Sequence, residues 1–143
     1  MKAFLKNQLL IIIFFHALIA MVGSLYFSDV LHYIPCVLCW YQRICLYPLV
    51  MISGIGYLRN DKNVFWYILP LSVTGLILAI YQNLLYYKII PESIVPCQNG
   101  VSCTTQYINW LGFITIPLLS GITFLSITCC SIIYIMLNKK NEE

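Results

Sequence analysis

The run "LLIIIFFHALIAMVGSLYF", residues 9–27, has no formal charge and is long enough to cross a lipid bilayer as a helix. Three further apolar stretches follow it, at residues 38–58, 64–86 and 112–137. Each comes close to or exceeds the roughly 20 predominantly apolar residues that a spanning helix needs. The alternating pattern of barrel strands is missing. The sequence therefore predicts an all-α integral membrane protein, with a four-transmembrane-helix bundle as a single domain over residues 1–143.

The composition supports this prediction. Of the 143 residues, 61% are hydrophobic and 9% are charged, and the mean hydropathy is +0.85. Soluble domains carry about 25% charged residues. Too few polar residues are present to cover a soluble surface, so the apolar side chains must face the lipid bilayer. Because no basic stripe with interleaved aromatic residues occurs, nucleic acid is excluded as a partner.

The positions of the basic residues predict the orientation, since short cytoplasmic loops are enriched in Lys and Arg. With both termini cytoplasmic, the inner side holds Lys2, Lys6, Arg59, Lys62, Lys139 and Lys140. The outer side holds only Lys88, with Arg43 at the boundary. We therefore expect a multi-pass protein of the bacterial plasma membrane, with outer loops at residues 28–37 and 88–109. The alternative of a cleaved signal peptide is disfavoured because the first apolar run is longer than the usual 7–15-residue core.

Four of the seven cysteines fall on the predicted outer face. Cys36 and Cys39 lie in "PCVLCWYQR", residues 35–43, and Cys97 and Cys103 bound "CQNGVSC", residues 97–103. This face is oxidising in a bacterial cell envelope, which permits disulfides. The other three cysteines fall inside the predicted spans, and we expect them to be apolar packing residues: Cys45, Cys129 and Cys130.

Three interpretations of the outer cysteines remain open: structural disulfides, a four-cysteine zinc site and a redox relay. The turn signal Asn99-Gly100 favours a bridge between Cys97 and Cys103. A bridge between Cys36 and Cys39 closes a tiny loop and constrains the unfolded chain very little, so it would be a weak structural staple. Such a pair can open and close with little backbone movement, which favours the relay.

Arg43 is predicted to lie beside this pair. Cys36 and Cys39 precede or open a helix, where unpaired N–H groups stabilise a thiolate. Arg43 is four residues beyond Cys39, hence on the same helix face, and its side chain leans back toward the helix start. We expect it to stabilise negative charge on Cys39 or on a molecule bound there. The alternative is a cation that extends to the interface.

These residues resemble a known family. The stretch "PCVLCWYQR", the four spans, the cysteines in two outer loops and "QYINWLGFITIP" (residues 106–117) are together similar to the DsbB/BdbC family of disulfide-bond formation proteins. The close spacing of Cys97 and Cys103 is similar to the short, bacillus-type members. The resemblance covers essentially the whole chain.

The resemblance implies a thiol:quinone oxidoreductase that reoxidises an extracytoplasmic thioredoxin-like thiol–disulfide oxidoreductase. The electron acceptor would be a membrane quinone, menaquinone or ubiquinone, and no metal is implied. By motif position, Cys97–Cys103 is the partner-facing disulfide and Cys36–Cys39 the quinone-proximal one. Arg43, together with Cys39, matches the quinone-binding position.

The third predicted span departs from the family pattern. Many relatives carry a His near its outer end, whereas this chain reads Tyr81-Gln82-Asn83. The proton donor to the quinone is therefore open, with His32 as a candidate, while His16 is expected to be a packing residue.

Two other functions remain as alternatives. One is a noncatalytic four-helix protein with structural bridges. The other is a conduit that carries electrons outward, for which Cys129 and Cys130 are the candidate inner cysteines.

Overall fold

The computed structural model describes residues 2–61, 63–90 and 115–139. They form four long α-helices: α1 (Lys2–Leu25), α2 (Val37–Leu58), α3 (Val64–Tyr86) and α4 (Ile116–Lys139). A π-helical segment, η1 (Tyr26–Val30), continues α1 directly. Each long helix is apolar enough to cross a membrane. The predicted all-helical fold with four apolar helices is confirmed.

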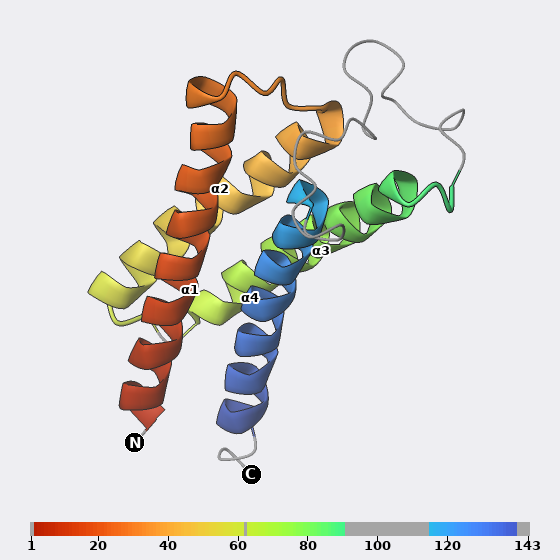
Figure 1. Ribbon diagram of the computed structural model, residues 1–143. Coiled ribbons are helices and arrows are strands. Elements are labelled where there is room, and N and C mark those ends of the chain that lie inside the picture. Colours follow the sequence, from red (N-terminus) through yellow and green to blue (C-terminus); the bar gives the residue numbers. More distant parts are fainter. Residues whose placement is uncertain (1, 62, 91–114, 140–143) are drawn as a thin grey trace.

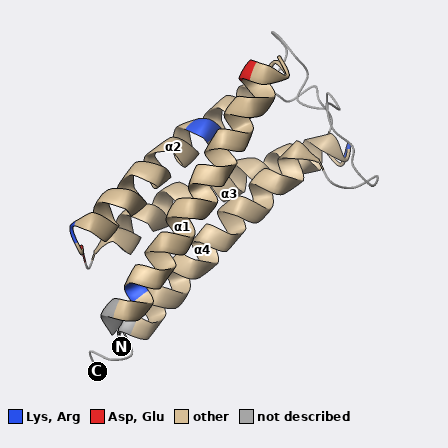
Figure 2. Ribbon diagram, turned by 60° about the vertical axis from the view of Figure 1, so that its left-hand side comes forward, with Lys and Arg blue, Asp and Glu red and all other residues tan. Residues whose placement is uncertain are grey.

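The helices form one antiparallel bundle (Figure 1). The start of α1 and the end of α4 lie at the same end of it, which we call the terminal end. The opposite end holds η1, the start of α2 and the end of α3, and we call it the cysteine end because Cys36 precedes α2 there. Helix α3 packs against α2 and α4, and α1 packs against α2. The contact between α1 and α4 is the least extensive of the four, and the two helices diverge toward the cysteine end (Figure 2).

Charged residues are confined almost entirely to the helix ends (Figure 2). The exception is Arg43, which lies within α2, the only charged residue of that helix. Large apolar side chains such as Ile12, Ile19 and Ile77 remain exposed along the helices. The composition predicts that apolar side chains face the lipid bilayer, and these exposed side chains fit that prediction. Which end faces the cytoplasm stays a prediction.

The core is built from apolar side chains of all four helices. Leu10 and Leu49 are fully buried, as are Phe65 and Phe124, and the rings of Phe65 and Tyr134 stack with centroids 4.0 Å apart. Gly75 of α3 allows the close approach of α4, because a Cβ at this position would lie 2.2 Å from the Phe124 ring. Small residues at such crossings let membrane helices pack without a gap.

Polar contacts near each end of the bundle also hold the chain together. At the terminal end, the Nζ of Lys6 donates to the backbone oxygen of Asn60 at 2.9 Å, and also to the Asn60 side-chain oxygen. Asn60 adopts a left-handed backbone conformation where α2 ends. At the cysteine end, the Nδ2 of Asn83 donates to the backbone oxygen of Pro117 at 2.9 Å and so ties α3 to the first turn of α4.

The helix bounds differ from the predicted apolar stretches. The first helix begins at Lys2 and, with η1, ends at Val30, beyond the predicted span 9–27 and into the predicted loop 28–37. Hydropathy marks the lipid-facing part of a helix, whereas the backbone hydrogen bonds continue into polar flanks. Most of the predicted loop 88–109 lies outside the described residues, as do residues 112–114 of the fourth predicted span.

We expect Gly75→Ala to lower the free energy of unfolding by about 1–3 kcal/mol, because the new methyl group would overlap the buried Phe124 ring, which would have to shift. Thermal unfolding in detergent measures the loss. Gly121→Ala is the matched control on α4, since its Cβ would lie 3.6 Å from the nearest atom, an ordinary contact. Equal stability of the two variants would contradict the close packing of α3 on α4.

Candidate functional site

The cysteine pair stands where α2 begins. Cys36 is the N-cap residue, in extended conformation, and its Sγ accepts a hydrogen bond from the backbone N–H of Cys39 at 3.4 Å. The first N–H groups of a helix have no partner within the helix, so a side-chain acceptor at this position stabilises the helix start. Local sequence thus places both cysteines at one end of the helix, as predicted.

The two sulfur atoms lie 2.8 Å apart as free thiols. A disulfide bond is about 2.05 Å long, so little movement separates this arrangement from a bridge. Cys36 is buried and Cys39 is partly buried. The hydrogen-bonded contact with Cys39 and burial raise the pKa of the Cys36 thiol.

Two glutamines complete the surroundings of the pair. The Nε2 of Gln82, on α3, lies 3.3 Å from the Cys39 sulfur and 3.4 Å from the Cys36 sulfur. The Oε1 of Gln82 accepts a hydrogen bond of 2.7 Å from the Nε2 of Gln42 on α2. Both amides are buried, at 3% and 7% exposure for Gln82 and Gln42.

Sequence reasoning did not assign these glutamines to the site. In the sequence, Gln82 stands in the segment where many relatives carry a histidine, and Gln42 stands in "PCVLCWYQR" beside Arg43. Their signal was present in the sequence, since polar side chains inside a membrane span are rare and mark functional positions.

Arg43 leans back toward the start of α2, as predicted, and is buried with 7% exposure. Its Nε donates to the Oγ of Ser24 and its Nη2 to the backbone oxygen of Ser24, both at 2.8 Å. Its Cζ lies 5.3 Å from the centroid of the Trp40 ring. The guanidinium is thus fixed between α2 and α1 rather than extended toward the interface. Ser24 is a further residue that the sequence did not point to.

A cavity of about 420 Å³ adjoins the pair. Cys36, Cys39 and Arg43 line it, together with Gln42 and Gln82. The remaining walls come mainly from apolar residues of α1, η1 and α4, among them Ile19, Ala20, Phe27, Ile116, Leu119 and Ile122. Ligand pockets in proteins typically have volumes of about 300–1,000 Å³, mostly apolar walls and a few polar groups. The cavity meets this description, and its polar groups include both cysteines.

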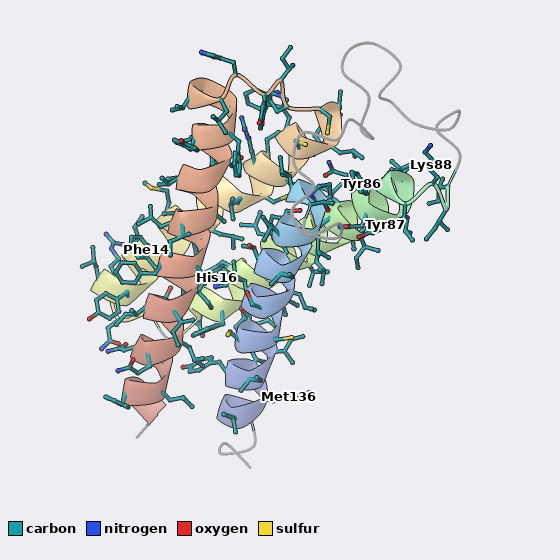
Figure 3. All side chains as sticks on the ribbon, in the orientation of Figure 1. Phe14, His16, Tyr86, Tyr87, Lys88 and Met136 are labelled. Carbon is teal, nitrogen blue, oxygen red and sulfur yellow. The ribbon has the colours of Figure 1, made fainter. Side chains whose placement is uncertain are left out.

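The two histidines lie at different places. His16 lines the cavity on α1, and its Nε2 lies 3.4 Å from the Oγ of Ser126 on α4 (Figure 3). It has a polar partner, as expected of a packing histidine, but it also faces a cavity. His32 is exposed in the connection between η1 and α2, with a left-handed backbone conformation.

The other predicted cysteines are only partly placed. Cys97 and Cys103 lie outside the described residues, so their predicted disulfide and its distance from Cys36 stay predictions. Cys45 is buried in the core, and Cys130 is partly buried and packs against the core. Both positions are as expected of packing residues. Cys129 is exposed on α4, which does not fit the expected packing role.

One of the three interpretations of the outer cysteines is a zinc site. Within residues 2–61, 63–90 and 115–139, no three His, Cys, Asp or Glu side chains are grouped so that they could hold a metal ion. A four-cysteine site would need Cys97 and Cys103, which are not described.

Comparison with known proteins adds the family. Residues 6–134 match the family model described as Disulfide bond formation protein DsbB. Disulfide bond formation protein C of Bacillus subtilis is 51% identical over 113 residues, which cover 78% of this chain and 80% of that protein. Probable disulfide formation protein C of Halalkalibacterium halodurans is 48% identical over 119 residues, which cover 83% and 87%. No solved structure matches the chain. The chain, with its paired thiols beside an apolar cavity, therefore belongs to the DsbB family of disulfide bond formation proteins, oxidoreductases that generate disulfides.

Proposed function

We propose that this protein is a thiol:quinone oxidoreductase of the bacterial plasma membrane. It takes electrons from an extracytoplasmic thioredoxin-like thiol–disulfide oxidoreductase and delivers them to a membrane quinone, menaquinone or ubiquinone. The observation that carries the proposal is the position of the Cys36 and Cys39 sulfurs, 2.8 Å apart on the wall of a largely apolar cavity that also holds Arg43.

The residues of the cavity fit a quinone. A quinone combines a flat ring bearing two carbonyl oxygens with a hydrocarbon tail. The apolar walls of α1 and α4 suit the tail and the ring faces, and Arg43 suits a carbonyl oxygen. A guanidinium carries five N–H groups, and Ser24 accepts from two of its nitrogens, so donors remain for a second acceptor.

The sparse packing of α1 on α4 gives a lipid-dissolved molecule a route to this cavity. Residues of both helices line it, including Ala20 and Gly23 of α1 and Ser120 and Thr123 of α4. Since their contact is the least extensive of the four main helix–helix contacts, we infer that the cavity wall between them is the easiest to part. A membrane quinone would then enter sideways, without passing through water.

The proposed relay begins at the pair that the structure does not describe. A thiolate of the partner attacks Cys97 and releases Cys103, and the partner's second thiol later resolves the mixed disulfide. Cys103 attacks Cys36 and releases Cys39 as a thiolate at the cavity wall. Cys97, once the partner has left, attacks Cys103, which re-forms the Cys97–Cys103 disulfide and releases Cys36. Each step is thiol–disulfide exchange, in which one S–S bond forms as another breaks.

Over one cycle the partner's dithiol loses two electrons and two protons and becomes a disulfide, and both pairs of this chain return to disulfides. The quinone, when bound, supplies the sink for those two electrons and two protons. Arg43 stabilises the negative charge that is released on Cys39, because both side chains line the same cavity away from water.

The proposed orientation places the cysteine end outside and the terminal end in the cytoplasm. Lys6 and Arg59 belong to the terminal end, and the positive-inside rule assigns that end to the cytoplasm.

In a cysteine-free background, Asn63→Cys should therefore react with a membrane-impermeant maleimide only after the cells are permeabilised. His32→Cys, at an exposed position of the other end, should react in intact cells. Gel-shift labelling reads both. Labelling of Asn63→Cys in intact cells would reverse the orientation and remove the relay with it.

Replacing any one of Cys36, Cys39, Cys97 or Cys103 by Ser should abolish oxidation of the partner, because each supplies one sulfur of the relay. Cys45→Ser, in the core, is the matched control and should retain most of the turnover. Cys103→Ser should also accumulate a mixed disulfide through Cys97, since the resolving thiol is missing. Non-reducing gels and mass spectrometry identify the trapped cysteine. A partner joined to Cys36 would show that the order of exchange is wrong.

Arg43→Leu should reduce quinone-dependent turnover by roughly ten- to a hundredfold. A hydrogen bond to a charged group contributes about 1.5–3 kcal/mol, and each 1.36 kcal/mol is worth about tenfold in rate. Arg43→Lys should be milder, because it keeps the charge but loses the planar fork of the guanidinium. Ser24→Ala removes only the hydroxyl acceptor and should cost a few-fold at most. Steady-state kinetics against quinone concentration measure all three.

Formation of the mixed disulfide between the partner and Cys97 should survive Arg43→Leu, Arg43→Lys and Ser24→Ala. If a well-folded Arg43→Leu protein kept its kcat and its KM for quinone, the arginine would have only a structural role.

A further inference from the structure

Gln42 and Gln82 have no role in the relay proposed above, yet they form a chain that ends on its sulfur atoms. Gln42 donates to Gln82, and Gln82 donates to both cysteines. Both amides are buried within membrane-spanning helices. Burying an amide in such surroundings is unfavourable unless its donors and acceptors are paired. The pairing partners here include the reacting atoms themselves.

The direction of the chain follows from the geometry of the amide group. Because the Oε1 of Gln82 accepts from Gln42 at 2.7 Å, its NH₂ group faces away from Gln42 and toward the sulfurs, at 3.3 and 3.4 Å. Rotating this amide by half a turn would bring its oxygen to the sulfurs and set two NH₂ groups against each other. An oxygen would repel a thiolate, and a disulfide has no S–H to offer it. Only the observed direction pairs in both redox states.

We propose that Gln82 is the hydrogen-bond donor that stabilises negative charge on the Cys36–Cys39 pair, and that Gln42 is the positioning residue that holds the Gln82 amide in its donating direction. The proposal rests on the proposed function only in taking this pair to be redox-active.

The consequence is a more oxidising pair. Reduction breaks the S–S bond, and the two electrons and two protons come from a dithiol that becomes a disulfide in turn. A hydrogen bond to a charged acceptor is stronger than one to a neutral acceptor. Gln82 therefore stabilises the reduced pair, in which a thiolate forms, more than the disulfide. It shifts the exchange with an incoming dithiol toward reduction of Cys36–Cys39 and speeds the release of the leaving sulfur.

The test is the redox equilibrium of this pair in the full-length protein. Cys97 and Cys103 are replaced by Ser so that one pair titrates, the protein is equilibrated with glutathione buffers, and the thiols are counted by alkylation with a maleimide. Gln82→Met keeps the length of the side chain but removes the donor. It should shift the equilibrium about tenfold toward the disulfide, which corresponds to a potential lower by about 30 mV. The alkylation rate of the reduced pair should fall in parallel.

Gln42→Met separates positioning from packing, because it leaves Gln82 in place but frees its amide to rotate. We expect a shift in the same direction and smaller than that of Gln82→Met. The double variant should match Gln82→Met alone, since both changes act through one contact. Ser72→Ala is the matched control: it is buried on α3 and bonds only within its own helix, to the backbone oxygen of Leu69. The redox potential of the Cys36–Cys39 pair in Ser72→Ala should not change.

An unchanged potential in a Gln82→Met protein with the wild-type melting temperature would overturn the proposal. If Gln82→Met did not fold, an unchanged potential in Gln42→Met would overturn it equally. Shifts that add in the double variant would show that Gln42 does not act through Gln82. Because the measurement uses neither quinone nor partner, failure of the relay in turnover assays would leave this result intact. A pair that formed no disulfide in any buffer would instead refute the proposed function.

Discussion

Inside a bilayer a polar side chain has only the protein to pair with, and this constraint determines how the helices of the bundle meet. Arg43 binds Ser24 and so joins α2 to α1, Gln42 binds Gln82 and joins α2 to α3, and Asn83 binds Pro117 and joins α3 to α4. Each contact has one workable geometry, whereas apolar contacts between helices tolerate sliding and rotation. All three lie toward the end of the bundle that holds the cysteines.

This clustering explains how a thiol pair can be held in place at the edge of a fluid membrane. Cys36 caps α2, and the first two turns of that helix supply Cys39, Gln42 and Arg43. Gln42 and Arg43 bind different neighbours, α3 and α1. The pair is therefore fixed from both sides, and the cavity beside it is framed by the same contacts. At the other end of the bundle, Lys6 and Asn60 close the turn between α2 and α3 without adding any reactive group.

The sequence predicted what depends on local pattern, and it failed where two distant segments meet. Hydropathy predicted the four helices, because residues that face lipid along a span are apolar. Spacing gave the cysteine pair and the backward lean of Arg43, since both follow from the geometry of one helical turn. Gln82 and Ser24 were missed because their partners lie on other helices, and no single-helix pattern says which faces meet. The exposure of Cys129 was missed for the same reason.

The cavity depends on two helices that lie far apart in the described sequence. Residues of α1 and α4 supply most of its walls, whereas Cys39 and Arg43 belong to α2 and Cys36 directly precedes it. A pair of helices made of α2 and α3 alone would keep both thiols and Gln82 but would lack those walls. The thiol pair is thus a property of one helix pair, and the space beside it is a property of the assembled bundle.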